Sequence, residues 1–244
     1  MIDSYGKNSH ARGIFNGIAN SYEAPAQIFS LFQYRRWHRR LVSQLRLTSR
    51  DSVLDVCTGT GLVATDIANS IGCSVIGLDL SDAMIKQAAY NIQSADPIPS
   101  VSLVQGKAEG LPFSDNSFDA LVFTFLLRYV ESPQDTLLEL ARVVRPGGQI
   151  ISLEFYIPQN PVLYLLWLFH TRIVLRLGTR FISQGWREVG AFLGPSISTF
   201  YSKYSLEDIV QMWTRAGIRD IRTDILSVGG AVIMWGNKES YAEK

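Results

Sequence analysis

The chain has 244 residues, of which 47% are hydrophobic and 18% are charged, and its formal net charge is +1. This balance is typical of a soluble globular protein, and the charge excludes a general attraction to nucleic acid. The two cysteines, Cys57 and Cys73, indicate neither a disulfide framework nor a zinc site, so a reducing, cytoplasmic compartment and no metal are expected. The polar N-terminal residues lack the apolar segment of a secretory signal.

A helix is predicted over residues 24–46, where apolar residues recur at three- and four-residue spacing. Strands are then predicted in alternation with helices. The strands are predicted at 52–56, 74–80, 100–106, 118–125 and 149–156. One helix is predicted at 62–71, a second begins after the capping residue Ser81, and a third is at 134–144. Pro146, Gly147 and Gly148 end the third helix. This alternation predicts a parallel sheet with helices on both faces.

Residues 157–200 are rich in aromatic residues and arginine and carry no strand signal, which indicates an inserted helical cap. Its longest apolar run, Pro161 to His170, is too short for a membrane-spanning helix, which needs about 20 residues. A helix at 205–217 and two antiparallel strands that meet near Gly229 follow. The expected fold is therefore α/β, a Rossmann-like, seven-stranded, mostly parallel sheet with a C-terminal antiparallel hairpin and an inserted helical cap.

The stretch "LDVCTGTGLVATDIA", from Leu54 to Ala68, carries the main motif. Gly59, Gly61 and Ala64 match the degenerate dinucleotide pattern G-x-G-x-x-A. Asp79 ends the next strand 20 residues after Gly59, where an acid binds ribose hydroxyls. Alone the pattern is a weak signal, because a tight strand-to-helix turn without a ligand also satisfies it.

Asp55 distinguishes between the ligands. A carboxylate at the end of the first strand would repel the pyrophosphate of a dinucleotide. S-adenosylmethionine has no phosphate and carries an ammonium and a sulfonium, which an acid attracts. The two glycines let the backbone approach that methionine tail. The motif is therefore interpreted as an S-adenosylmethionine loop, and a nicotinamide dehydrogenase is the alternative that a titration with NAD tests.

The segments "VLDVCTGTG", "GLDLSDAMI", "GKAEGLPFSDNSFD" and "ARVVRPGGQIISLEF" together resemble the class I S-adenosylmethionine-dependent methyltransferases, over about residues 50–156. Within that class the chain is most similar to the ubiquinone/menaquinone C-methyltransferases. The likeness includes Phe15, Tyr22 with Glu23, Ser30 and Trp37 of an N-terminal signature, together with "LLRYV" (126–130) and "SLEFYIP" (152–158).

The resemblance implies roles for the matching positions. The methionine part of the cofactor would be held by Asp55, Thr58, Gly59 and Gly61, and the ribose by Asp79 and Leu80. The adenine would be held by Met84, Lys107, Ala108 and Glu109, and the transferred methyl group would lie beside Phe123 and Thr124. It also implies one methyltransferase domain over 1–244, with a helical lid (1–47), a cofactor-binding core (48–156), the cap (157–204) and a C-terminal helix and hairpin (205–238).

The chain departs from the family pattern at several positions. Cys57 stands where a first glycine is usual, and because Cys is small the loop is expected to form. Lys107 stands where an Asp or Asn contacts the adenine amine, and Tyr129 replaces an Asn after Arg128. Trp235 replaces a His near the last strand, and the family's second signature is poorly matched before the last helix.

Four residues are candidates for catalysis, each with a structural alternative. Arg128 would contact a substrate phenolate, or pair on a helix surface with an acid such as Glu131. Glu154 would face the site, or anchor a backbone turn. Tyr22 would close the site, or pack in the core. His170 would act as a base, or serve only to hold the cap.

The apolar cap points to the acceptor. It would enclose an apolar tunnel or take a lipid tail from a membrane, or else pack on the sheet or form a homodimer face. The run "YRRWHRR" (34–40) would touch anionic head groups, or be a solvated helix face. The expected reaction is methylation of a ring carbon of a prenylated quinol by a cytoplasmic enzyme, either free or peripherally bound to a membrane. The alternatives are N- or O-methylation of a phospholipid head group or another amphiphile, and binding of the cofactor without chemistry.

Overall fold

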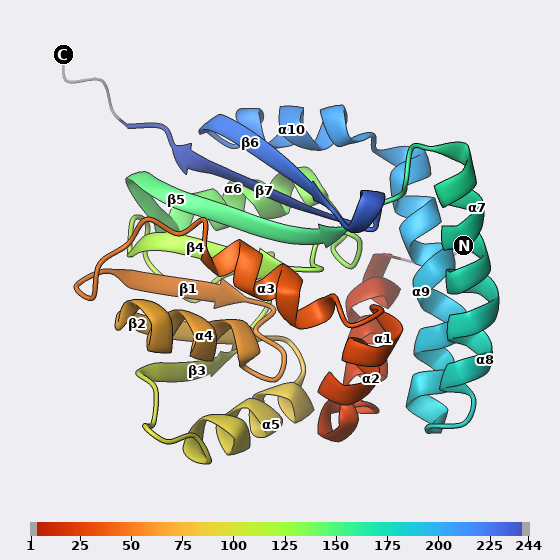
Figure 1. The fold of residues 1–244 in the computed structure, drawn as a ribbon. Helices are drawn as coiled ribbons and strands as arrows, with labels where there is room; N and C mark the ends of the chain where they lie inside the picture. The colour runs from red at the N-terminus through yellow and green to blue at the C-terminus, as the bar shows by residue number, and fades with distance from the viewer. Residues whose placement is uncertain (1–3, 241–244) are drawn as a thin grey trace.

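The computed structural model describes residues 4–240, and a seven-stranded sheet forms its centre (Figure 1). The strand order is β3-β2-β1-β4-β5-β7-β6, in which the first five are parallel and β7 runs antiparallel to both of its neighbours. The strands are β1 (Ser52–Val56), β2 (Ser74–Asp79), β3 (Val101–Gln105), β4 (Phe118–Thr124), β5 (Val144–Phe155), β6 (Ile218–Leu226) and β7 (Ala231–Lys238). The predicted sheet with its C-terminal hairpin is confirmed.

The strand connections place helices on both faces of the sheet. They are α4 (Leu62–Ile71), α5 (Asp82–Gln93), α6 (Pro133–Val143) and α10 (Leu206–Arg215). One apolar cluster joins α6 and α10 to the sheet, and a second joins α4 and the N-terminal segment to it. The predicted cap of α5 is confirmed, because the Ser81 hydroxyl accepts a hydrogen bond from the backbone N–H of Met84 at 3.1 Å.

Strand β5 is longer than predicted. It begins at Val144, directly after α6, rather than at Gln149, and the Pro–Gly–Gly sequence lies inside it. The pairing with β4 shifts between Phe118 and Ala120, and Gly147 has a φ of +80° in this irregular stretch. The bulge accommodates the Pro–Gly–Gly residues within the strand. Because such residues usually lie in turns, the start of β5 was predicted too late in the sequence.

The N-terminal segment contains three α-helices rather than the single helix predicted over 24–46. They are α1 (Ser4–Asn16), which was not predicted, α2 (Glu23–Phe29) and α3 (Tyr34–Val42). The turn between α2 and α3 is formed by Leu31 and Phe32, whose φ values are +54° and +61°. The Gln27 side chain donates to the carbonyl of Phe32 at 3.0 Å and holds the turn. Because both turn residues are apolar, the helical periodicity runs through the break.

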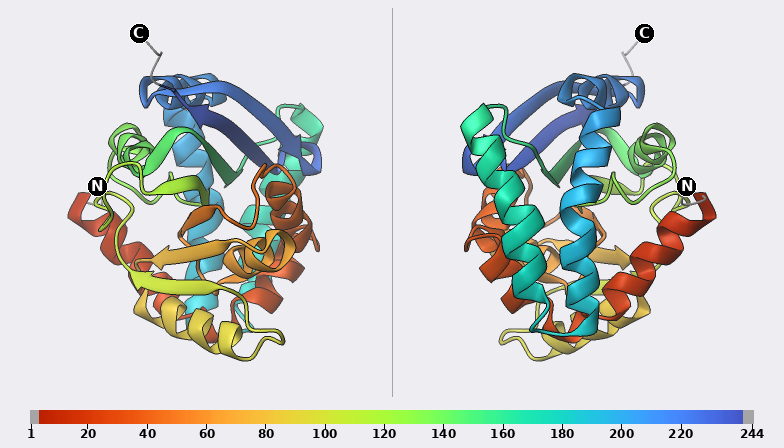
Figure 2. Two further views of the ribbon diagram at one scale, coloured as in Figure 1. Left: turned by 90° about the vertical axis from the view of Figure 1, so that its left-hand side faces the viewer. Right: turned by 90° about the vertical axis from the view of Figure 1, so that its right-hand side faces the viewer.

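The cap is helical, as predicted. It contains α7 (Pro161–Phe169), η2 (His170–Val174), α8 (Leu175–Thr179) and α9 (Gln184–Lys203). The first three form one continuous rod that packs beside α9 (Figure 2). The contact is close, because a Cβ at Gly194 would lie 3.0 Å from the Cβ of Thr171 in the rod.

The rod, Pro161–Thr179, is longer than the ten-residue run that the sequence suggested. It has 19 residues and a mean hydropathy of 1.2, so by length and composition alone it could cross a membrane. The expectation that this region is too short for such a helix is therefore wrong. Only 17% of its apolar window is buried, so it also differs from the core helix of a globular protein.

Candidate functional site

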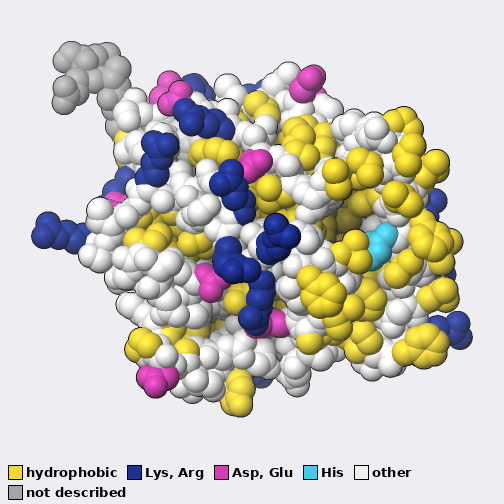
Figure 3. All heavy atoms as spheres, viewed as in Figure 1, with side chains coloured by type: hydrophobic (Ala, Val, Ile, Leu, Met, Phe, Trp, Pro, Cys, Tyr) yellow, Lys and Arg dark blue, Asp and Glu magenta, His cyan; other side chains and the backbone are white. Residues whose placement is uncertain are grey.

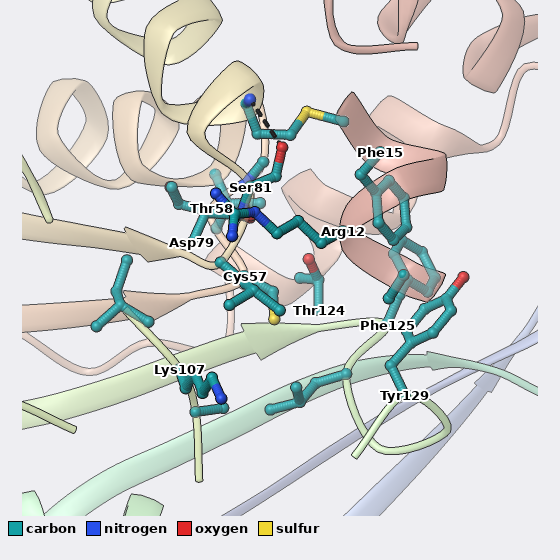
Figure 4. Close-up of a pocket in the computed structure, with 18 of the residues that line it drawn as sticks. Arg12, Phe15, Cys57, Thr58, Asp79, Ser81, Lys107, Thr124, Phe125 and Tyr129 are labelled. Atoms are coloured by element: carbon teal, nitrogen blue, oxygen red, sulfur yellow. Dashed lines mark hydrogen bonds between the residues drawn. The ribbon is translucent and has the colours of Figure 1, made fainter. Parts of the chain in front are cut away.

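A cavity opens at the carboxyl ends of β1, β2, β3 and β4 and is covered by α1 (Figure 4). We call it the cofactor cavity. Of the residues expected to bind the cofactor, those that line it are Thr58, Gly59, Asp79, Leu80, Met84, Lys107, Ala108, Glu109 and Thr124. Parallel strands that end at one edge bring these segments together, as ligand sites of open α/β sheets require.

The loop between β1 and α4 has left-handed backbone at three positions. The φ values are +62° at Cys57, +55° at Gly59 and +81° at Gly61. Its N–H groups are held from β2, because the backbone N–H of Thr58 donates to the carbonyl of Leu78 at 3.0 Å and that of Gly59 donates to Asp79 Oδ2 at 2.9 Å. The loop forms with a Cys where a glycine is usual, although an L-residue there carries strain.

Asp79 has the position expected for a ribose ligand. Its Oδ1 accepts a hydrogen bond from the backbone N–H of Ser81 at 2.9 Å, while Oδ2 holds Gly59. Each carboxylate oxygen has further acceptor capacity for a hydroxyl. Burial raises the pKa of Asp79, and hydrogen bonds from Ser81 and Gly59 counteract the shift. The residue therefore ties the loop to β2 and still offers oxygens to a diol.

Asp55 lies beneath the loop and is fully buried. Its Oδ2 accepts a hydrogen bond from the Thr58 hydroxyl at 2.7 Å and the backbone N–H of Ala64 also stabilises the carboxylate, whereas Oδ1 makes no hydrogen bond of standard geometry within the described residues. Burial raises the pKa of Asp55 to about 7. A buried carboxylate oxygen without a partner is costly unless a donor or a cation reaches it. A cationic ligand held above the loop would stabilise the ionised form of Asp55 through space, whereas a phosphate would destabilise it.

Three expected contacts differ from the prediction. Asp55 and Gly61 do not line the cofactor cavity: Asp55 supports the loop from below, and Gly61 caps α4. Phe123 is not beside the expected methyl position, because its buried ring packs 6.0 Å from that of Trp213 on the opposite face of the sheet. Side chains alternate along a strand, so the neighbouring Thr124 faces the cavity instead.

A second cavity of about 340 Å³ adjoins the first, and its lining is mostly apolar. We call it the apolar cavity. Its walls come from α1, the turn between α2 and α3, α7 and α9, and the end of β5. The residues that line both cavities are Phe15, Tyr22, Tyr34, Phe125 and Tyr129. These five aromatic side chains form a collar where the two cavities meet.

Arg128 lies at this collar and lines the apolar cavity. Its guanidinium carbon is 4.5 Å from the ring centroid of Tyr129 and 4.9 Å from that of Phe155, and its side chain is only 5% exposed. One terminal nitrogen donates to the Tyr129 hydroxyl at 2.9 Å, while Nε and the other terminal nitrogen have no hydrogen-bond partner among the described residues. A buried cation thus keeps donors free for an anionic oxygen.

Glu154 is the acid that faces Arg128, at 3.9 Å, so the surface pairing of Arg128 with Glu131 is wrong. Its Oε1 accepts hydrogen bonds from the backbone N–H groups of Leu126 and Leu127 at 2.7 and 2.8 Å. Burial raises its pKa to about 7. Glu154 lines neither cavity, so the structure places it as the anchor of the turn that carries Arg128 rather than at the reacting atoms.

Tyr22 and His170 have different positions. Tyr22 lines both cavities, and burial raises the pKa of its hydroxyl, which therefore remains a hydrogen-bond donor. His170 lines only the apolar cavity, and its Nε2 hydrogen-bonds to the carbonyl of Phe29 at 2.8 Å. This contact joins the cap to the turn after α2 and favours the structural alternative for His170.

Sequence reasoning missed several cavity residues, among them Phe15, Tyr34, His38 and Phe125. Phe15 was noted only as part of a signature. Tyr34 and His38 lie one turn apart on the buried side of α3, where the basic run drew attention to the opposite side. His38 lines the cofactor cavity with both ring nitrogens unpartnered among the described residues, and burial lowers its pKa to about 3. The apolar spacing of α3 was the signal that could have found both.

The arrangement suits one kind of chemistry. A cavity lined in part by Asp79 and Glu109, and so able to hold a cationic cofactor, meets the apolar cavity at the aromatic collar, and the buried Arg128 guanidinium lies against Tyr129 of that collar. Among the described residues, no group of three or more His, Cys, Asp or Glu side chains is placed to hold a metal ion. The two cavities can therefore align a cationic group donor with an apolar acceptor that carries an oxygen.

Known proteins resemble the chain over nearly its whole length. It is 30% identical over 233 residues to a demethylmenaquinone methyltransferase of Lactiplantibacillus plantarum, covering 95% of this chain and 97% of that protein. It is 32% identical over 236 residues to a ubiquinone/menaquinone biosynthesis C-methyltransferase of a Geobacter species, covering 95% and 97%. In fold it resembles an S-adenosylmethionine-dependent methyltransferase of Aquifex aeolicus, with a TM-score of 0.59 at 18% identity over 88% of this chain and 98% of that one.

The cofactor cavity, with its glycine loop, Asp79 and the unpartnered oxygen of Asp55, agrees with these similarities. The model of the ubiE/COQ5 methyltransferase family matches residues 4–238. The protein is an enzyme that uses S-adenosylmethionine, and the chain belongs to the ubiE/COQ5 methyltransferase family.

Proposed function

We propose that the enzyme transfers a methyl group from S-adenosylmethionine to a ring carbon of a hydrophobic quinol, whose tail occupies the apolar cavity. The observation that carries the proposal is Arg128, a buried guanidinium with unpartnered nitrogens at the junction of the two cavities. Ring carbons become nucleophilic when a ring hydroxyl loses its proton, and a nearby cation stabilises the resulting phenolate. The names of the relatives, demethylmenaquinone methyltransferase among them, support this substrate class.

Different residues of the chain bind the cofactor, orient the acceptor and exclude water. When bound, S-adenosylmethionine supplies the methyl group from its sulfonium. Thr58 and the glycine loop would hold the methionine part, with Asp55 supplying negative charge from beneath the loop, and Asp79 would hold the ribose. Arg128 orients the ring oxygen by donating hydrogen bonds to it, and Tyr22 adds a donor from the collar. Glu154 positions Arg128 through the Leu126–Leu127 turn. Burial by the aromatic collar excludes water from the acceptor carbon, which strengthens these interactions.

The alternatives are less well supported. An ethanolamine-type head group carries a phosphate and an ammonium, and Arg128 at the junction would repel the ammonium, which is the group to be methylated. An oxygen acceptor would gain from Arg128 too, so the position of the labelled methyl group in the product distinguishes it from a ring carbon. Binding of the cofactor without chemistry would explain the ion pair of Arg128 with Glu154 but not the guanidinium nitrogens that remain without a hydrogen bond, which are costly to bury.

We further propose that the whole chain acts as one catalytic unit in the cytoplasm, peripherally associated with a membrane. A long-tailed quinol resides in lipid, and the apolar cavity lies beneath the most apolar part of the protein surface. A homodimer that covers this surface is the competing arrangement.

The test uses purified protein, S-adenosylmethionine with a labelled methyl group, and a chemically reduced short-tail quinone lacking the ring methyl. Arg128→Ala is expected to lower kcat roughly 100- to 1000-fold, as loss of an oxyanion donor does, while the Kd of the cofactor stays within about twofold. Arg219→Ala, on the surface of β6, is the matched control and should leave both unchanged. Equal losses in kcat and cofactor affinity for Arg128→Ala would contradict its assigned role. Label on an amine or a lipid head group would contradict the substrate class.

A further inference from the structure

We propose that the outer face of the cap docks on an anionic lipid bilayer and passes the acceptor from the bilayer directly into the apolar cavity. The transfer of the acceptor rests on the proposed function, whereas the surface features that indicate docking do not depend on catalysis. The docking face consists of the exposed apolar side chains of the rod, of the residues just after it and of the turn between α2 and α3. They are Ile28, Leu31, Phe32, Val162, Leu165, Leu166, Phe169, Ile173, Val174, Leu177, Phe181 and Ile182.

The docking face is unusual in its density of exposed apolar side chains. Of the 17 large hydrophobic residues that are exposed in the described part of the chain, 12 belong to it. Phe181 is 87% exposed, and Leu31 and Phe32 are each 64% exposed. Figure 3 shows hydrophobic side chains gathered over α7 and α8, with a hollow among them. A contiguous patch of this kind marks an interaction surface.

The docking face surrounds the opening of the apolar cavity. Leu31 and Leu166 are exposed to solvent and also line that cavity, so both surfaces are continuous. The contact of His170 with the Phe29 carbonyl holds the rod against the turn at this edge. A tail that leaves a bilayer under this face would enter the cavity without crossing water, which would otherwise cost about 0.8 kcal/mol for each exposed CH₂.

The charges on the rod and just after it are of one sign. Residues 157–187 contain four arginines and no Asp or Glu, whereas the whole chain has 23 basic and 22 acidic residues. Arg172, Arg176 and Arg180 are exposed on or beside the rod and form no ion pair within the described residues. The rest of the chain is therefore net acidic. Apolar side chains bordered by free arginines match a bilayer with anionic head groups.

A bilayer explains the face better than a second copy of the chain. A protein partner on this face would close the cavity opening, and the arginines of two copies would repel each other across a twofold axis. Membrane crossing is also a poor fit, because the rod is packed along α9 at Gly190 and Gly194. The rod would lie in the plane of the bilayer surface, with its apolar side buried and α9 above it.

The first test measures binding of the purified protein to vesicles of phosphatidylcholine, with and without phosphatidylglycerol, by flotation. The variant combines Phe32→Ser, Phe169→Ser and Phe181→Ser, none of which lines the apolar cavity. Its partition into anionic vesicles should fall on the order of 100-fold. The matched control combines Tyr90→Ser, Ile98→Ser and Leu138→Ser, which are equally apolar and exposed but lie elsewhere, and it should bind as the wild type does.

A second variant tests the charge. Replacing Arg172, Arg176 and Arg180 with Gln should weaken binding to anionic vesicles roughly 100-fold, since each arginine near such a surface contributes about fivefold. Binding to pure phosphatidylcholine should change little. Failure of the wild-type protein to bind anionic vesicles at all would overturn the proposal. So would a solution dimer that the phenylalanine variant dissociates.

Activity distinguishes this proposal from the proposed function. The phenylalanine variant should methylate a soluble, short-tail quinol at the wild-type rate, and should lose most activity toward a long-tail quinol embedded in vesicles. Equal activity of variant and wild type on the embedded quinol would overturn docking through this face. If no quinol is methylated by either protein, the proposed function fails, and vesicle binding still decides whether the docking face is correct.

Discussion

The two cavities of the molecule are built in different ways. The cofactor cavity is made mainly from short loops at the ends of adjacent strands, and its shape depends on backbone conformation at Cys57, Gly59 and Gly61. The apolar cavity is made from side chains between residues 14 and 230, on helices that meet only in the folded chain. A few local residues thus specify where the cofactor binds, whereas the acceptor side depends on how separate helices pack.

This difference predicts that each cavity can be damaged while the other survives. The largest effect is expected for Asp79→Ala, which removes the carboxylate that holds Gly59 and the expected ribose contact. Cofactor affinity should fall roughly 100-fold, because charge-assisted hydrogen bonds contribute about 1.5–3 kcal/mol each. Calorimetric titration with S-adenosylhomocysteine measures it. Binding of an apolar dye in the apolar cavity should be unchanged.

Asp66→Ala is the control for this change, because Asp66 lies on α4 and does not line the cofactor cavity. It should bind the cofactor as the wild type does. A parallel loss of dye binding in Asp79→Ala would show that the two cavities do not form separately.

The next effect concerns the cap. A Cβ at Gly190 would fall on the Thr179 hydroxyl of the rod, so Gly190→Ala should push α9 from α8. The overpacking should lower the free energy of unfolding by about 1–3 kcal/mol, measured with urea, while cofactor affinity stays within about twofold. Gly13→Ala is the control, because nothing lies near that position on α1. A stable Gly190→Ala variant would contradict the close contact.

A smaller effect is expected from pH. The pKa of Asp55 is raised to about 7 by burial, so at pH 6 most of the protein carries a neutral Asp55, and the cationic cofactor prefers the ionised form. Affinity for S-adenosylmethionine should therefore rise roughly fivefold from pH 6 to pH 7. Asp55→Asn should bind more weakly and remove this dependence. An unchanged slope in the variant would assign the titration to another group.

The smallest effect is expected for Cys57→Gly. The φ of +62° at Cys57 costs an L-residue about 1–2 kcal/mol, which glycine avoids, although glycine also loses more entropy on folding. The variant should gain up to about 1 kcal/mol in unfolding free energy, with cofactor affinity unchanged. Chemical denaturation measures the gain. A loss of stability would mean that the Cys57 side chain contributes packing that outweighs the strain.

Much of the fold could be predicted from residue patterns that extend over short stretches of the sequence. Strand and helix periodicity predicted the succession of strands and helices along the chain, and the predicted helix cap at Ser81 is present. The start of β5 was missed because its bulge depends on the pairing with β4, and the break at Leu31 and Phe32 was missed because both residues are apolar and continue the helical periodicity. Periodicity reports which side of an element is buried, and does not report where the backbone turns.

The candidate site divides in the same way. Cofactor residues such as Gly59 and Asp79 were predicted, because a strand–loop–helix unit brings them together whatever surrounds it. Phe123 and Thr124 were both expected beside the methyl group, but adjacent side chains of a strand point to opposite faces, and only Thr124 lines the cofactor cavity. Arg128 was named, but its actual neighbours were not, since Glu154 and Phe155 reach it only through the pairing of β4 and β5.

By itself, the sequence determined the α/β architecture and the cofactor loop, because hydrophobic periodicity and left-handed backbone positions act over a few residues. Only the tertiary structure decided that Tyr34 and Phe125 join the collar, that Glu154 anchors a turn, and that the apolar side of the rod faces outward. An apolar residue is equally suited to a core, a cavity or a membrane, so its role depends on what packs against it.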